Sequence, residues 1–442
     1  MRRKYDNILI SWSKLKKAKP MMLWGARQVG KTHLMKSFAK THFSDWIYLN
    51  FEQDAELSKL FEGSISPENI VKNLALYLER GPITPDTLII MDEIQESERA
   101  LNSLKYFNES SEAFKVLCAG SLLGVKLSRS GFPVGQVNFL DVYPCTFLEF
   151  LSMTGEPYLA DYLEDPKRGL ISQVIHQKIL QMYCEYLFVG GMPEVVSVYA
   201  KDRQDFPSVR ETQNRILRSY QLDFAKHAPS DMVVRIAEIF DKIPQHLAKE
   251  NKKFMYSAIA ASARARDYSG ALQWLIDARI LQKVMHISSP DIPLLASADS
   301  NIFKTYFVDT GLLGAMMNVP QKLILDQTTL FSSYKGALAE NIAAQQLIAI
   351  GKKIFYWTSA GKAEVDFVFQ DEKGVVALEV KAGENLHSRS LQELIRKFPH
   401  IFPFKSSLLN AKKSEIITNI PAYGIGIEGF WNAHPENSLG LL

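Results

Sequence analysis

The residues with the clearest chemical signature form one loop near the N-terminus, Gly25-Ala26-Arg27-Gln28-Val29-Gly30-Lys31-Thr32. This is a complete Walker A sequence, in which glycine lets the backbone approach phosphates closely and adopt a positive φ. The backbone N–H groups of such a loop, with the N-terminus of the helix that follows, surround phosphate oxygens. We expect Lys31 to reach the β- and γ-phosphates and Thr32 to hold Mg²⁺. The loop therefore predicts an ATP and Mg²⁺ site, and the alternative is a glycine-rich turn without a ligand.

A second pair of polar residues, Asp92 and Glu93, follows the apolar run at residues 88–91. A buried strand of this kind carries its carboxylates to the sheet edge beside the loop. We predict that Asp92 holds Mg²⁺, mostly through water, and that Glu93 is the base that orients the attacking water. Ser121 follows the apolar run at 114–119 and is expected to contact the γ-phosphate, or else to end a strand in an ordinary turn.

A third set of candidates lies near the C-terminus, where Asp366 and Glu379 come from the two strands of a predicted hairpin. Side chains alternate along a strand, so Glu379 and Lys381 share a face that Asp366 can join. Glu340, on the preceding helix, adds a carboxylate. Converging carboxylates bind Mg²⁺ or Mn²⁺, and a lysine beside them can position or deprotonate a metal-bound water. The alternatives are an ordinary acidic–basic pair, or Lys381 turned inward to neutralise the site.

The elements that position the first two sets are short apolar runs separated by segments with helical spacing. Alternating strands and helices predict a mainly parallel sheet covered on both faces. Together with the Walker A loop, or P-loop, this makes the N-terminal part an α/β fold of the P-loop NTPase class. The runs are residues 21–24, 46–51, 88–91, 114–119 and 137–142.

The middle of the chain has a different texture. Residues 147–227 read as mostly helical, with a break at Gly190-Gly191-Met192-Pro193. From residue 231 the spacing predicts three helices and then a strand at 280–284, an order that suggests a winged helix-turn-helix. This module reads DNA in some proteins and is a plain packing unit in others. Lys252, Lys253, Arg264 and Arg266 are its candidate phosphate contacts.

The last part of the chain predicts a small α/β unit. A helix is expected at residues 338–350, strands at 354–357, 364–369 and 375–380, and another helix from Ser390. Residues 370–374 join the last two strands as a hairpin.

Composition excludes several classes of protein. The chain has 442 residues, 47% of them apolar, which suits two or three packed domains and argues against disorder. A net charge of +3 excludes a globally basic coat. Cys118, Cys145 and Cys184 form no Cys-x-x-Cys pair, and no apolar run is long enough to span a bilayer, so we expect a cytoplasmic protein without membrane contact.

The N-terminal basic residues are interpreted as a solvated helix face. They are Arg2, Arg3, Lys4, Lys14, Lys16, Lys17 and Lys19.

The combination of these features resembles a prokaryotic AAA-type ATPase family whose C-terminal half is a domain of unknown function. The resemblance rests on the Walker A loop with Asp92-Glu93-Ile94-Gln95, on the segment 188–194, on Asp309-Thr310-Gly311-Leu312-Leu313, and on the motifs around Glu340, Asp366 and Glu379. It covers nearly the whole chain. It implies an AAA core, a winged helix and a restriction-endonuclease-like domain of the PD-(D/E)xK type, with nuclease residues at Glu340, Asp366, Glu379 and Lys381.

The sequence departs from this family at Gln136, where a basic residue is expected. An arginine that serves a neighbouring subunit would make the protein a homo-oligomer. Arg129 is the candidate, and a solvated loop arginine is the alternative.

The resulting prediction is an Mg²⁺-dependent ATPase that acts on DNA. Its expected catalytic residues are Lys31, Glu93, Asp366, Glu379 and Lys381. Alternatively, the protein is an ATP-dependent switch or binding protein with an inactive nuclease-like fold, or a signalling switch that assembles without DNA. The expected domains are the ATPase at 1–150, a helical lid or linker at 151–230, the winged helix at 231–300, and the nuclease-like domain at 301–442.

Overall fold

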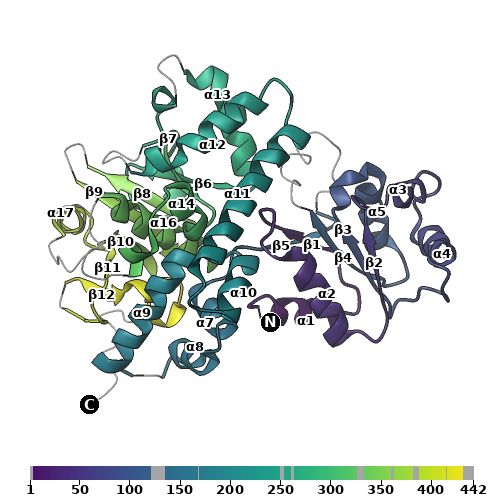
Figure 1. Ribbon diagram of the computed structural model, residues 1–442, viewed down its shortest axis with the longest axis horizontal. Helices are drawn as coiled ribbons and strands as arrows, with labels where there is room; N and C mark the ends of the chain where they lie inside the picture. The colour runs from purple at the N-terminus through teal and green to yellow at the C-terminus, as the bar shows by residue number, and fades with distance from the viewer. Residues whose placement is uncertain are drawn as a thin grey trace. The chain divides into compact units, whose positions relative to one another are not determined.

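The computed structural model describes residues 3–120, 135–167, 169–248, 253–259, 263–325, 333–359, 363–381, 388–414 and 416–431. It divides into two compact units (Figure 1). The first comprises Met1–Tyr143 with Asp277–Arg279, and the second comprises Pro144–Ile276 with Ile280–Leu442. Each unit is built on its own sheet.

The sheet of the first unit has five parallel strands in the order β2-β3-β4-β1-β5. They are β1 (Met21–Trp24), β2 (Trp46–Asn50), β3 (Leu88–Asp92), β4 (Lys115–Gly120) and β5 (Asn138–Asp141). These strands confirm the five predicted from apolar runs. Because all are parallel, their carboxyl ends meet at one edge, where ligands of open α/β sheets bind. The predicted P-loop NTPase fold is therefore confirmed.

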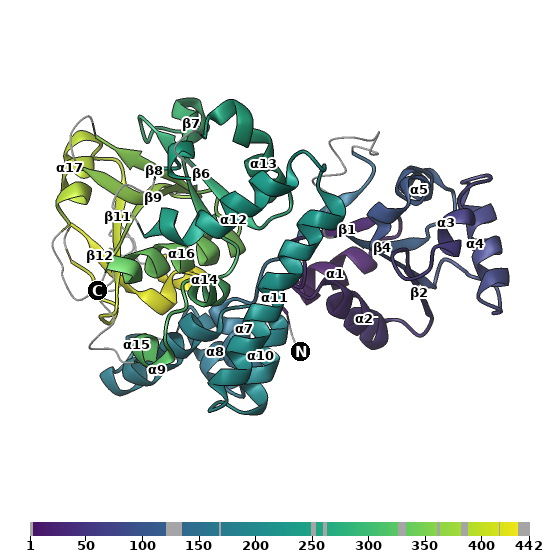
Figure 2. The same ribbon diagram turned by 45° about the horizontal axis from the view of Figure 1, so that its top comes forward.

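Helices cover both faces of this sheet. They are α1 (Asp6–Ser13), α2 (Lys31–His42), α3 (Glu56–Lys59), α4 (Pro67–Tyr77) and α5 (Glu98–Glu109). On β3, Ile89 and Met91 pack into a core shared with α4 and α5. Figures 1 and 2 show α1 and α2 on one side of the sheet and α5 on the other. Alternation along β3 therefore places Asp92 on the face opposite that core.

The second unit begins with five helices: α7 (Phe147–Met153), α8 (Pro157–Glu164), α9 (Gln173–Val189), α10 (Pro193–Lys201) and α11 (Phe206–His227). They confirm the helical prediction for residues 147–227. The predicted break is also present, since α9 ends at Val189 and Gly190 has a φ of 78°. α12 (Val233–Leu247) and α13 (Ala265–Asp277) follow.

A mixed sheet of seven strands forms the rest of this unit, in the order β12-β11-β10-β9-β8-β6-β7. The strands are β6 (Leu281–Ile287), β7 (Ala298–Phe307), β8 (Phe355–Thr358), β9 (Glu364–Asp371), β10 (Gly374–Val380), β11 (Phe402–Ser407) and β12 (Thr418–Pro421). The accompanying helices are α14 (Thr310–Met316), α15 (Gln321–Leu325), α16 (Ser333–Ala349) and α17 (Arg389–Lys397). The predicted hairpin is present as β9 and β10, which pair antiparallel with Gly374 opposite Asp371.

The strand predicted at residues 280–284 is β6, and its surroundings were not predicted. β6 pairs antiparallel with β7 and also parallel with β8. The antiparallel pair therefore continues directly into the C-terminal sheet, and α12 and α13 lie beside it (Figure 2). One sheet thus runs through both segments that we treated as separate, residues 231–300 and 301–442.

Within the described part of the chain, every helix is too short or too polar to cross a lipid bilayer.

Candidate functional site

The loop between β1 and α2 has a backbone that glycine makes possible. Gly30 precedes α2 with a φ of 90°, and Gln28 also has a positive φ of 65°. A Cβ atom on Gly25 would lie 2.1 Å from the carbonyl oxygen of Val142, which leaves no space for a side chain. The Walker A glycines are therefore required by the path of the chain itself.

Lys31 is the first residue of α2 and is buried. Its ammonium group donates to the carbonyl oxygens of Gly25 and Ala26, each at 2.9 Å. Burial lowers the pKa of Lys31 to about 8, and the nearby carboxylates of Glu93 and Asp92 oppose that shift. The Lys31 side chain thus folds back over the Walker A loop, where we predict that it contacts the phosphates of the bound nucleotide.

Asp92 ends β3 and lies against the start of α2. The hydroxyl of Thr32 donates to Oδ2 of Asp92 at 2.6 Å, and Oδ1 accepts the backbone N–H of Glu93 at 3.1 Å. Burial raises the pKa of Asp92, while the hydrogen bond from Thr32 acts in the opposite direction. The two predicted magnesium ligands of the first unit are therefore brought into direct contact.

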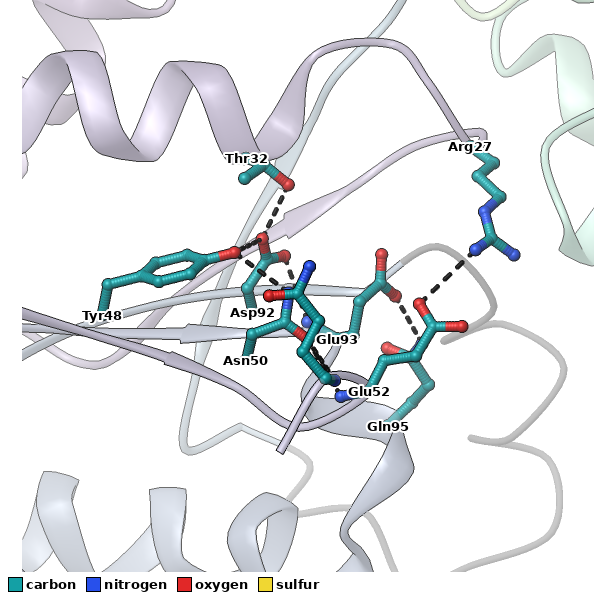
Figure 3. A network of polar contacts seen from close by, with 9 residues as sticks. Arg27, Thr32, Tyr48, Asn50, Glu52, Asp92, Glu93 and Gln95 are labelled. Atoms are coloured by element: carbon teal, nitrogen blue, oxygen red, sulfur yellow. Dashed lines mark hydrogen bonds and ion pairs between the residues drawn. The ribbon is translucent and has the colours of Figure 1, made fainter. Parts of the chain in front are cut away.

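Glu93 follows β3 in a left-handed conformation, with φ 49° and ψ 40°. The side chain of Gln95 donates to its Oε2 at 2.6 Å (Figure 3). Arg27, from the loop, forms an ion pair with Glu52 at 3.4 Å. Charged and amide groups thus surround the edge of the sheet where the sequence analysis predicted the ATP and Mg²⁺ site.

Two other candidates of this unit, Ser121 and Arg129, lie outside the described residues. Gln136, at the position where a basic residue was expected, accepts a hydrogen bond from Asn108 at 2.5 Å.

The interpretation of the N-terminal basic residues as a solvated face is wrong for Arg3, which is buried. Its guanidinium donates to the carbonyl oxygens of Tyr143 at 2.7 Å and Val29 at 3.4 Å. Arg3 therefore links the Walker A loop to the segment that follows β5 through hydrogen bonds to both. No local pattern distinguishes it from its basic neighbours, because its partners lie far along the sequence.

In the second unit, Glu340 lies beside a buried cation that was not predicted. Lys304, on β7, is buried, and its ammonium lies 3.9 Å from Oε2 of Glu340. The same ammonium also pairs with Glu364. Glu340, Glu364 and Asp366 together raise the pKa of Lys304 above its ordinary value, although burial opposes them. A lysine on an edge strand thus supplies positive charge to these carboxylates.

The other candidates lie at the ends of the hairpin strands. Oδ2 of Asp366 accepts the backbone N–H of Val380 at 2.8 Å, which places Asp366 beside the residue between Glu379 and Lys381. Lys381 pairs with Oε1 of Glu379, whereas Oε2 of Glu379 is buried without a hydrogen-bond partner. Lys405 stands opposite Glu379 in the register of β10 and β11.

Among the described residues, no three His, Cys, Asp or Glu side chains are grouped as a metal-ligand set. Two lysines, Lys304 and Lys381, instead approach the carboxylates. Of these, Lys304 could not be found from the sequence, because β7 lacks a regular apolar pattern and lies far from Glu340 along the chain.

Three family models match successive parts of the chain. An AAA domain matches residues 17–151, a domain of unknown function (DUF8612) matches residues 180–323, and a second domain of unknown function (DUF4143) matches residues 335–420. The AAA match includes the Walker A loop, Asp92 and Glu93. The first unit is therefore similar in sequence to AAA domains, and the C-terminal match agrees with the resemblance to a family that ends in a domain of unknown function.

Solved structures resemble the chain weakly. The Walker-type ATPase of Pyrococcus abyssi is 13% identical, with 72% of this chain and 95% of that chain covered and a TM-score of 0.44. The Thermotoga maritima RuvB Holliday junction branch migration motor is 14% identical, with 64% and 89% covered and a TM-score of 0.30. Drosophila ORC bound to DNA is 14% identical, with 72% and 94% covered and a TM-score of 0.26.

No curated protein matches the chain. The fold assignment therefore rests on the sheet order and on the AAA match.

Proposed function

We propose that the first unit binds ATP with Mg²⁺ and hydrolyses it. The contact between Thr32 and Asp92 carries this proposal, since it joins the P-loop to the strand that bears the acidic pair. Two further features support it: the glycine-dependent path of the loop and the burial of Lys31 at its centre.

The residues present fit a magnesium ion. Thr32 and Asp92 offer a hydroxyl and a carboxylate, which are oxygen ligands of the kind that Mg²⁺ prefers, and they already touch each other. When bound, Mg²⁺ neutralises charge that develops on the phosphates. The loop backbone of residues 25–32 and the start of α2 would hold the phosphates, Lys31 would supply a positive charge, and Ser121 would contact the γ-phosphate.

Glu93 is the proposed base. It would accept a proton from the water that attacks the γ-phosphorus, while the bond from that phosphorus to the bridging oxygen breaks. Its position directly after Asp92 places it at the same sheet edge. An arginine from a neighbouring subunit, with Arg129 as the candidate, would complete the site in a homo-oligomer.

A binding assay with a fluorescent ATP analogue and a phosphate-release assay test this function. Lys31→Ala should abolish binding or hydrolysis, whereas Glu93→Gln should retain binding and lose turnover. If the wild-type protein shows no saturable binding of Mg·ATP, the proposed function is wrong.

We further propose that ATP turnover is coupled to action on DNA. The order α12, α13 and the antiparallel pair of β6 and β7 supports a winged helix, with a short 3₁₀ turn (Tyr256–Ala258) in the place of the predicted second helix. Arg266 lies in the first turn of α13 and Arg264 directly precedes that helix, and both would face phosphates. Of the other predicted phosphate contacts, Lys252 lies outside the described residues. In this proposal the protein is cytoplasmic and has four parts. They are an ATPase domain at 1–150, a helical lid or linker at 151–230, a winged helix at 231–300 and a nuclease-like domain at 301–442.

In this proposal the C-terminal domain cleaves DNA with Mg²⁺ or Mn²⁺ held by Glu340, Asp366 and Glu379, beside Lys381. The buried Oε2 of Glu379, which lacks a hydrogen-bond partner, supports a ligand there. Cleavage of supercoiled or branched DNA that requires Mn²⁺ and is lost in Glu379→Gln would support it. Failure to cleave any DNA or RNA, with or without ATP, would rule the activity out.

A specific observation favours the alternative, an ATP-dependent switch whose nuclease-like fold is inactive. Lys304 pairs with Glu340 and Glu364 and so places a permanent cation among the carboxylates. Binding of DNA without cleavage, modulated by ATP, would be the result expected from this alternative.

A further inference from the structure

Tyr48, in the middle of β2, reaches the predicted magnesium ligand Asp92. Its hydroxyl donates a hydrogen bond to Oδ2 of Asp92 at 2.9 Å and accepts one from the side-chain amide of Asn50 at 3.1 Å (Figure 3). Tyr48 was not among the residues that the sequence singled out.

The pairing of the strands explains this reach. Asn50 lies opposite Asp92 in the parallel register of β2 and β3, and Tyr48 is two residues earlier on the same face. Ile47 and Leu49 point into the core on the other face. The tyrosine ring therefore lies along the α2 side of the sheet, with its hydroxyl directed toward the carboxyl edge (Figure 3).

A cation from α2 holds the ring. The ammonium of Lys36 lies 3.6 Å from the centroid of the Tyr48 ring. Lys36 is one helical turn beyond Thr32, so both residues face the same way from α2. The cation–π contact fixes the ring, and the hydroxyl of Thr32 meets the same carboxylate that Tyr48 contacts.

Oδ2 of Asp92 is thus held from two elements, by Thr32 on α2 and by Tyr48 on β2. A bound metal ion would affect the hydrogen bonds from these two donors differently. Thr32 is itself a proposed magnesium ligand, so its hydroxyl oxygen would serve the ion as well as Asp92 when the ion is bound. Tyr48 comes from a different strand and can keep its hydrogen bond throughout.

We propose that Tyr48 is a positioning residue that orients Asp92 for magnesium, an inference that rests on the proposed ATPase function. Mg²⁺ demands near-ideal octahedral geometry and keeps several of its waters, so the direction of the carboxylate that receives them matters. Groups that orient metal ligands commonly account for a tenfold to hundredfold change in metal affinity or activity. Tyr48 would therefore set how much Mg²⁺ the site requires rather than how well it binds the nucleotide itself.

The test compares Tyr48→Phe with the wild-type protein and with Tyr77→Phe. Tyr77 is a matched control, because its hydroxyl donates to Oδ2 of Asp54 at the same 2.9 Å but is exposed. Each protein is titrated with Mg²⁺ at a fixed concentration of ATP, and the midpoint of phosphate release is measured. Binding of a fluorescent ATP analogue is measured in parallel, in EDTA and in Mg²⁺.

In Tyr48→Phe we expect the Mg²⁺ midpoint to rise by about tenfold, with analogue affinity in EDTA within twofold of wild type. Tyr77→Phe should leave both quantities unchanged. A midpoint within twofold of wild type for Tyr48→Phe, or an equal shift in Tyr77→Phe, would overturn the inference. If Tyr48→Phe does not fold, Lys36→Met carries the test, since it keeps the hydroxyl but removes the cation that holds the ring. A smaller rise of about threefold is then expected, and an unchanged midpoint would overturn the inference.

The outcomes separate this inference from the function beneath it. A wild-type protein that binds no Mg·ATP would remove the ATPase proposal and this inference together. Wild-type binding and turnover with an unchanged midpoint in the variants would remove the role of Tyr48 alone.

Discussion

The carboxylate of Asp309 accepts the backbone N–H of Gly191, with 2.6 Å between Oδ2 and the nitrogen. Its Oδ1 accepts the backbone N–H of Leu312 at 2.9 Å and so caps α14. A Cβ atom on Gly190 would lie 2.2 Å from this Oδ1. One buried side chain thus joins the loop after α9 to the start of α14, and the two segments that carried part of the family resemblance prove to be contact partners.

This contact predicts a pH dependence of stability. Burial raises the pKa of Asp309 to about 6 from the ordinary 3.8, although hydrogen bonds from Gly191 and Leu312 act in the opposite direction. Because the folded state holds the proton more tightly than the unfolded state, the contribution to stability is present below about pH 4. This contribution to the free energy of unfolding is lost as the pH rises through about 6, and a pKa shift of this size corresponds to about 3 kcal/mol.

Asp309→Asn cannot titrate and should lack that loss. Urea unfolding of the wild-type protein and the variant, followed at pH 4.5 and at pH 7, measures the difference. Asp205→Asn is the control, because the pKa of Asp205 is lowered by its hydrogen bond with Ser208 and its pH dependence has the opposite sign. Parallel pH curves for the wild-type protein and Asp309→Asn would contradict the prediction.

Gln95 offers a prediction about turnover. Its amide donates to Oε2 of Glu93, and Glu93 stands in a left-handed conformation. Gln95→Leu removes this hold on the proposed base, so we expect kcat to fall by about tenfold while KM for ATP stays within twofold, since orientation of the base matters chiefly in the transition state. Steady-state phosphate release provides both constants.

Gln136→Leu is the comparison for Gln95→Leu, since Gln136 is a glutamine of the same unit that bonds Asn108 rather than Glu93. A rise in KM with unchanged kcat in Gln95→Leu would indicate a role in nucleotide binding instead.

Lys304 should be a major determinant of stability in the second unit. Lys304→Met would leave Glu340 and Glu364 without their buried cation. Removal of one partner from a buried ion pair costs about 3–5 kcal/mol, so unfolding should require much less urea. Lys397→Met breaks the exposed pair with Glu393 and should cost less than about 1 kcal/mol.

Manganese adds a second measurement to this comparison. If the carboxylates around Lys304 accept a divalent ion once the lysine is gone, Mn²⁺ should raise the melting temperature of Lys304→Met more than that of the wild-type protein. Equal effects of Mn²⁺ on both proteins would show that removal of Lys304 creates no new ion site among these carboxylates.

The winged-helix proposal predicts a change in salt dependence. Arg266 is exposed at the start of α13, and Arg264 precedes it. Replacement of both arginines by glutamine should weaken DNA binding. It should also reduce the slope of log K against log salt by about one unit for each phosphate that an arginine no longer neutralises. Fluorescence anisotropy at several salt concentrations measures affinity and slope together.

The control for this double variant removes two exposed lysines of the first unit, Lys16 and Lys17, and alters the net charge equally. The same loss of affinity in both double variants would indicate that net charge alone is responsible. Unchanged binding in both would indicate that residues 231–300 are a packing unit without a role in DNA binding.

Much of the first unit was predictable because its determinants are local. Each apolar run became a strand, and the Walker A loop lies between β1 and α2 as its glycines require. The acidic pair at the end of β3 was placed correctly at the edge of the sheet, since a parallel strand must end there. Such features depend on residues that are neighbours in the sequence, and their periodicity reports the side of the chain that is buried.

The contacts that complete the sites could not be predicted, because they join residues distant in the chain. Tyr48 meets Asp92 only through the register of β2 and β3, and Lys304 meets Glu340 only because β7 is the edge of a sheet whose order departs from chain order. The sequence by itself determined which residues have the chemistry for a phosphate-binding loop and an acidic hairpin. Tertiary structure decided which partner each charge receives, because strand order and register set the distances between charged groups and burial sets how strongly they interact.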